Sequence, residues 1–142
     1  MVIVAAISDS DQSREIAARA DELARAFDDR LHLVHVTEET EYTRIVEKQS
    51  GTRETDTGSV EDNAAGRAAE GLDEVVSADY EVVGRVGNPG KKVVEYAAEV
   101  DARYIVIGGR SRSPVGKALF GSVTQSILLN ADRPVVTLTT PE

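Results

Sequence analysis

Apolar side chains gather in five short runs that are separated by longer segments of mixed composition. The first run, Val2–Ile7, consists of Val, Ile and Ala alone, which is the pattern of a strand buried on both faces. Strands of this kind belong to parallel sheets covered by helices. The predicted strands are Val2–Ile7, Leu31–Val36, Tyr80–Val86, Arg103–Ile107 and Val135–Thr139.

Between the runs, apolar residues recur three and four positions apart, as they do along the buried face of a helix. This spacing predicts four helices. The first helix has the buried face Ile16, Ala20, Leu23 and Phe27, and the second, over Val60–Val76, has Ala64, Ala68, Leu72, Val75 and Val76. The third has Val93, Val94, Ala97 and Ala98, and the fourth has Ile127 and Leu128.

Two of the helix starts carry capping residues. Asn88 and Pro89 are suited to the N-cap and the first helical position of the third helix. Ser122 and Gln125 have the spacing of a capping box, which predicts that the fourth helix begins at Ser122.

The segment from Thr37 to Ser59 is dense in Glu, Thr, Ser and Gly. Tyr42, Ile45 and Val46 are spaced for a short helical turn. The composition nevertheless predicts a mobile excursion between the second strand and the second helix.

Strands and helices alternate along the whole chain, with short connections between them. Such alternation predicts parallel crossover units and the α/β class, with a five-stranded parallel sheet covered by helices. The 142 residues are enough for a real core, and we expect a single domain over residues 1–142.

The chain is acidic, with 25 Asp and Glu residues against 16 Lys and Arg and a net charge of −9. Like charge repels a phosphate backbone, so we expect no nucleic-acid partner. The apolar runs are too short to cross a membrane and no leader pattern is visible, so a cytoplasmic location and no membrane partner are expected. The Lys-poor, acidic composition suits an ordinary cytosolic protein or a halophilic one, and both stay open.

The usual motifs of catalysis are missing. There is no cysteine, which excludes thiolate chemistry and disulfides. Ala118 follows Gly116-Lys117, so a Walker A loop is absent. His32 and His35 lie an odd number of residues apart on one predicted strand, so they point to opposite faces and cannot share a metal ion. We expect no catalytic residues, no protein-held metal and no enzymatic activity.

The segment after the fourth predicted strand is suited to an anion. It runs from Gly108 to Gly121, contains Arg110, Arg112 and Lys117, and precedes a predicted helix start. Free backbone N–H groups at a helix N-terminus bind phosphates. The alternative is a solvated basic loop that offsets the acidic surface, but basic residues concentrated there in an acidic protein favour a bound anion.

Asp9 and Asp11 follow the first predicted strand. Ligands of open parallel sheets bind at the carboxyl ends of strands where the strand order reverses. Carboxylates there could bind ribose hydroxyls or a phosphate-bound Mg²⁺, and the alternative for each is to cap the first helix.

Several groups of residues resemble the universal stress protein family, over nearly the whole length of the chain. They are the Ser10 turn, His35-Val36, Gly87-Asn-Pro89, Val106-Ile-Gly-Gly109, Gly121-Ser122-Val-Thr124 and Arg133-Pro-Val-Val136. The resemblance implies a doubly wound, Rossmann-like sheet with strand order 3-2-1-4-5 and helices on both faces.

Nucleotide-binding members of this family carry a loop written Gly-x-x-Gly, nine residues, then Gly-Ser or Gly-Thr. Ser111 replaces the second glycine here, and Ser8 replaces the family's aspartate at the end of the first strand, with Asp9 adjacent. The resemblance implies that the nucleotide site comprises Ser8, Asp9, Val36, Gly108, Ser111, Gly121, Ser122, Val123 and Thr124, with Val36 against adenine and the residues from Gly108 to Thr124 around the phosphates.

The resemblance further implies a stress-response protein that binds ATP or a related adenine nucleotide, with Mg²⁺ accompanying it. The last strand would leave an unprotected edge in a monomer, and family members often pair this edge, so we expect a homodimer through the C-terminal edge strand. The alternative is an interaction or scaffold module with the same fold that needs no nucleotide.

Overall fold

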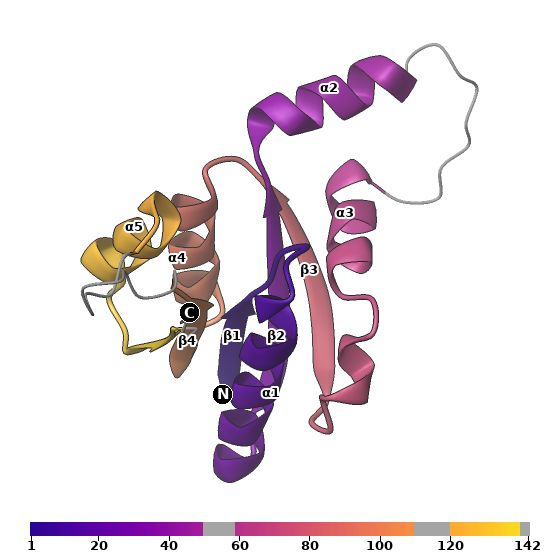
Figure 1. Ribbon diagram of the computed structural model, residues 1–142. Coiled ribbons are helices and arrows are strands. Elements are labelled where there is room, and N and C mark those ends of the chain that lie inside the picture. Colours follow the sequence, from indigo (N-terminus) through magenta and orange to yellow (C-terminus); the bar gives the residue numbers. More distant parts are fainter. Residues whose placement is uncertain (50–58, 110–119, 140–142) are drawn as a thin grey trace, which may run out of the picture.

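The computed structural model describes residues 1–49, 59–109 and 120–139. Its strands form one parallel sheet in the order β3-β2-β1-β4-β5 (Figure 1). The predicted fold class and strand order are therefore confirmed. The strands are β1 (Val2–Ala6), β2 (Arg30–Thr37), β3 (Tyr80–Val86), β4 (Tyr104–Gly108) and β5 (Val135–Leu138).

Helices cover both faces of the sheet (Figure 1). Successive side chains of β1 point alternately to the two layers: Ile3 and Ala5 pack with α1 and α3, whereas Val4 packs with α4 and α5. This double burial explains why β1 is apolar at every position. The helices are α1 (Gln12–Phe27), α2 (Glu39–Gln49), α3 (Val60–Ala68), α4 (Pro89–Glu99) and α5 (Ser122–Asn130), with a 3₁₀ helix η1 (Leu72–Glu74).

The predicted buried face of α1 holds except at its last position. Ile16 and Ala20 are buried in the core, but Phe27 is 41% exposed. Phe27 lies at the C-terminal end of the helix, where its ring carries the Arg103 guanidinium 4.3 Å from its centroid. The aromatic ring therefore covers the rim of the sheet and binds a cation there, instead of filling the core.

The prediction of a mobile excursion after Thr37 is wrong for its first half, because Glu39–Gln49 forms the helix α2. Acidic residues in its first turn and Lys48 in its last turn both favour the helix dipole. Figure 1 shows α2 projecting beyond the carboxyl ends of the strands, near α3. The remainder of the predicted excursion, residues 50–58, lies outside the described residues.

A single helix over Val60–Val76 is also wrong. The helix α3 ends at Ala68, and Gly71 then adopts a left-handed conformation with φ of 80° before η1 begins. The apolar residues Val75 and Val76 still pack against the core, but from beyond the helix. The glycine thus turns the chain so that the last apolar residues reach the sheet without a continuous helix.

Of the two predicted caps, one is confirmed. The Asn88 side chain accepts a hydrogen bond from the backbone N–H of Lys91 at 3.0 Å. The fourth helix does begin at Ser122, as predicted, but the capping box is wrong, because Gly121 occupies the N-cap and Ser122 is already helical. Gln125 instead donates its amide to the carbonyl oxygen of Phe120 at 2.9 Å.

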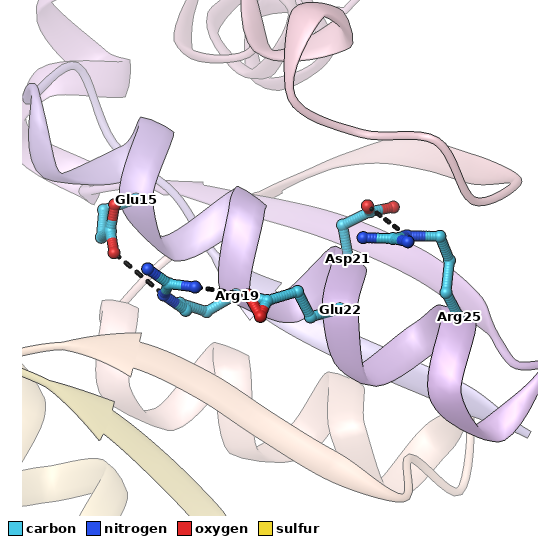
Figure 2. A network of polar contacts seen from close by, with 5 residues as sticks. All are labelled: Glu15, Arg19, Asp21, Glu22 and Arg25. Carbon is cyan, nitrogen blue, oxygen red and sulfur yellow. Dashed lines mark hydrogen bonds and ion pairs between the residues drawn. The ribbon is translucent and has the colours of Figure 1, made fainter.

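A buried carboxylate on α1 fixes the connection that leads into β3. The Asp21 side chain is 2% exposed and accepts the backbone N–H groups of Ser77 and Ala78, each at 2.8 Å. Its other oxygen accepts Arg25 Nε at 2.8 Å, whereas Glu22 pairs with Arg19 at the helix surface (Figure 2). Burial raises the pKa of Asp21, but these hydrogen bonds outweigh it, and the pKa lies below its usual value.

Replacing Asp21 by Ala should lower the free energy of unfolding by about 2–4 kcal/mol, because two backbone N–H groups lose their acceptor. The matched control on the same helix is Glu22→Ala, which removes a half-exposed ion pair and should cost less than about 0.5 kcal/mol. Urea unfolding of the two variants measures both values, and equal losses would contradict the structural role of Asp21.

The stabilising effect of Asp21 should also depend on pH. Because its folded pKa is depressed, its contribution is complete above the unfolded value of about 3.9 and is lost as the pH falls through the folded value. In Asp21→Asn, the free energy of unfolding should therefore fall less steeply than in the wild type below about pH 5. Urea unfolding from pH 7 to 3 tests this, and parallel curves would contradict it.

Candidate functional site

The strand order reverses between β1 and β4, which are neighbours in the sheet. The chain leaves β1 into α1 on one face and leaves β4 toward α5 on the other. A reversal of this kind opens a crevice at the carboxyl ends of the two strands. The structure has a cavity of about 300 Å³ there, a volume within the range of small-molecule sites.

Most of the cavity wall is apolar, and it continues the core. Val34, Val93, Ile107 and Ile127 belong to the core cluster between the sheet and the α4–α5 layer, and they also face the cavity. Such a wall suits the flat apolar body of a ring. The apolar lining residues are Ala6, Ile7, Ile16, Val34, Val36, Pro89, Val93, Ile107, Val123 and Ile127.

Polar side chains border the cavity where β1 turns into α1. The hydroxyl oxygens of Ser8 and Ser10 lie 3.1 Å apart. The backbone N–H of Ser8 donates to Ser13 Oγ at 2.7 Å, and Ser13 Oγ donates back to the Ser8 carbonyl oxygen at 2.7 Å. These bonds fix the turn, so two hydroxyls are held at the edge of the crevice.

Gln12, the first residue of α1, closes the other side of this turn. Its Nε2 donates to the carbonyl oxygens of Gly109 at 2.9 Å and of Leu138 at 3.3 Å. A Cβ atom at Gly108 would collide with the Gln12 amide and with Ile16. The absence of a side chain at Gly108 therefore allows Gln12 to reach across the end of β4.

The N-terminus of α5 lies at the opposite wall. The backbone N–H groups of Ser122, Val123 and Thr124 come before Gln125, the first residue of the helix whose N–H has an intrahelical acceptor, and among the described residues no side chain caps them. Thr124 Oγ1 donates to the Gly108 carbonyl oxygen at 2.8 Å. This bond ties the helix start to the end of β4 and presents a positive helix end to the crevice.

No charged side chain lines the cavity within the described residues, and its one titratable group is His35. Burial lowers the pKa of His35, which nearby Asp9 and Glu41 partly oppose and Arg67 reinforces. The imidazole is therefore neutral near pH 7. The main fixed positive field that the described residues direct into the cavity is the N-terminus of α5.

The structure brings together part of the predicted nucleotide site. Ser8, Val36, Gly108, Val123 and Thr124 all line the cavity. Three predicted residues, Asp9, Gly121 and Ser122, are not among its lining residues. The remaining one, Ser111, lies outside the described residues, as do the basic residues Arg110, Arg112 and Lys117.

Asp9 lines a neighbouring polar hollow, together with Asp11, Arg14, Arg67 and Glu70. Both carboxylates follow β1, but the turn directs them toward α3 and away from the apolar wall. Asp11 occupies the N-cap of α1, yet its side chain accepts no capping hydrogen bond. Neither of the roles considered for Asp11 is therefore visible in its contacts.

Sequence reasoning missed Gln12 and His35 as cavity residues. The two histidines do lie on opposite faces, as predicted. His32 is buried, with Nδ1 2.7 Å from the Tyr96 hydroxyl and Nε2 3.0 Å from Glu81, whereas His35 borders the cavity. The position of His35, directly before Val36 and near the end of the strand next to β1, could have indicated from the sequence that it borders the cavity.

Within residues 1–49, 59–109 and 120–139, no group of three His, Cys, Asp or Glu side chains lies close enough to hold a metal ion. None of the described helices is long and apolar enough to cross a membrane.

Comparisons with known proteins agree with this architecture. A universal stress protein of Mycolicibacterium smegmatis is 56% identical over 36 residues, which are 25% of this chain and 28% of that protein. The match thus spans little more than a quarter of that relative's length.

Two solved structures cover the chain almost completely. The first, a universal stress protein from Archaeoglobus fulgidus, is 30% identical, with a TM-score of 0.70 and coverage of 96% of this chain and 97% of that one. The second, a universal stress protein from the same organism in complex with dAMP, is 25% identical, with a TM-score of 0.65 and 96% coverage of both chains.

The model of the universal stress protein family matches residues 1–138. Together with the strand order and the full-length structural matches, this match shows that the chain belongs to the universal stress protein family.

Proposed function

We propose that this protein is a stress-response protein that binds an adenine nucleotide in the cavity between β1 and β4. The observation that carries the proposal is an apolar cavity of about 300 Å³ directly beside the N-terminus of α5, whose first N–H groups have no capping side chain among the described residues. A nucleotide needs an apolar wall for its base and hydrogen-bond donors for its phosphates, and the two lie on one crevice here.

In this proposal the base lies against Val36 and the apolar residues that continue the core. The phosphates lie at the start of α5, where the N–H groups of Ser122, Val123 and Thr124 are free of intrahelical partners. Gly108 and Gly121 frame the loop between β4 and α5, with Ser111 within it. The serine hydroxyls at the β1–α1 turn, above all Ser8, face the sugar, and Asp9 lies just beyond them.

The comparisons support an adenine nucleotide in particular. The universal stress protein from Archaeoglobus fulgidus that is in complex with dAMP shares 25% of its residues with this chain over 96% of both. A Mg²⁺ ion would be held through the phosphate oxygens of the ligand, because the described lining of the cavity offers no carboxylate. The proposed role is binding, with no catalytic group assigned.

We further propose that the protein acts as a homodimer through β5. This strand pairs with β4 along one side and ends the sheet, and each of its side chains is half-buried. The carbonyl oxygens of Pro134 and Leu138 accept hydrogen bonds from β4 and from the residue after it. Strand alternation then directs the N–H and C=O groups of Val135 and Thr137 away from β4, where a second copy can pair with them.

Titration calorimetry with dAMP, AMP and ATP, with and without Mg²⁺, tests the nucleotide site. Val36→Glu should weaken binding at least tenfold, because it places a carboxylate in the apolar wall and repels an anionic ligand. The matched control is Val46→Glu on the projecting helix α2, which adds the same charge away from the cavity and should leave binding unchanged. Absence of heat with every nucleotide would contradict the proposal and favour a nucleotide-independent scaffold.

Light scattering tests the dimer. Thr137→Pro removes an outward N–H without removing a bond to β4, and should convert the dimer to a monomer. Val82→Lys, at the edge strand β3 on the other side of the sheet, is the control and should leave the mass unchanged. A monomeric wild type, or a dimer that survives Thr137→Pro, would contradict pairing through β5.

A further inference from the structure

His35 borders the cavity at its boundary between apolar wall and polar turn. It is a half-buried residue of β2, directly before Val36. Its neighbour on the adjacent strand β3 is Gly84, where a side chain would collide with the backbone of Glu61. No side chain at position 84 therefore competes with the imidazole for space beside the crevice, on the face of the sheet that α3 covers.

The two ring nitrogens of His35 have different surroundings. Nδ1 is enclosed by protein and has no hydrogen-bond partner among the described residues. Within the described residues Nε2 has no partner either, but it is not enclosed, so it lies on the open side of the ring. An enclosed polar atom without a partner is rare in native proteins and calls for an explanation.

The position of the proton follows from these surroundings. Burial lowers the pKa of His35, Asp9 and Glu41 oppose this, and Arg67 adds to it. The ring is therefore neutral near pH 7 and carries one N–H. A proton on Nδ1 would leave an enclosed donor without an acceptor, which is less favourable than an unfilled lone pair at that place. The favoured tautomer has its proton on Nε2.

We propose that His35 is a specificity-determining residue whose Nε2–H donates a hydrogen bond to an unprotonated ring nitrogen of the bound base. This assignment rests on the proposed nucleotide site and deepens it. Val36 and His35 both line the cavity, although their side chains point to opposite faces of β2, so the base meets His35 where the cavity passes the carboxyl end of this strand. Among ligands of the same shape, the site then selects those that present an acceptor at this edge.

Two variants of equal side-chain length separate the hydrogen bond from packing. Gln places an amide N–H near the position of Nε2, whereas Met fills the same space without a donor. In calorimetric titrations with dAMP, His35→Met should weaken binding about tenfold and His35→Gln by less than about threefold. Thermal unfolding without ligand checks that both variants are folded.

Three analogues of dAMP identify the acceptor, because each replaces one ring nitrogen, at position 1, 3 or 7, by C–H. One of them should bind the wild type about tenfold more weakly than dAMP does. The same analogue should bind His35→Met no more weakly than it binds the wild type, because the two changes remove one shared hydrogen bond.

Nitrogen-15 NMR of the imidazoles gives a readout that does not depend on affinity. The chain has two histidines, and His32 is the internal control because its Nδ1 lies by the Tyr96 hydroxyl and its Nε2 by Glu81. His35 should carry its proton on Nε2, and dAMP should shift this nitrogen while the His32 signals stay in place.

The possible outcomes separate this assignment from the proposed function. If the wild type binds dAMP and His35→Met binds it equally well, or if His35 carries its proton on Nδ1, the role of His35 is wrong and the nucleotide site stands. If the wild type binds neither dAMP nor ATP, the nucleotide site is wrong and the role of His35 falls with it.

Discussion

The two faces of the parallel sheet must both be covered, and this constraint shapes the molecule. Ile3, Val4 and Ala5 of β1 have no exposed surface, so each face of the central strand needs a helix layer. Right-handed crossovers place α1 on one face and α5 on the other. No helix can then close the carboxyl ends of β1 and β4. The cavity is the space that remains, and core residues at the carboxyl ends of the strands form its apolar wall.

The sequence predicts this framework because burial on both faces leaves a direct signal, an unbroken apolar run such as Val2–Ile7. The sequence predicts the extent of a helix less well where the backbone conformation of one residue determines where the helix ends. The apolar spacing up to Val76 is genuine, yet Gly71 turns the chain, and the residues beyond it reach the core without a helix. Composition was equally misleading for α2, whose polar residues indicated a loop although their charges favour a helix dipole.

The candidate site divides in the same way. Val36, Gly108 and Thr124 were expected from the resemblance to the family, whose motifs lie at strand ends and at a helix start, and all three line the cavity. Gln12 was missed, since its partners Gly109 and Leu138 lie 97 and 126 residues away in the chain. His35 was missed because its significance lies in the surroundings of each ring nitrogen, which no linear pattern contains. Strand ends can be read from a sequence, whereas contacts between distant segments cannot.

The bridge made by Gln12 has a consequence for how this chain can change by mutation. Its amide occupies the space that a side chain at Gly108 would need, and it holds the ends of β4 and β5 together. A larger residue at 108 therefore needs a shorter residue at 12, and it must also displace the side chain of Ile16, which a Cβ atom at 108 would meet as well. Substitutions at positions 12 and 108 are therefore coupled, although the two residues lie far apart in the sequence.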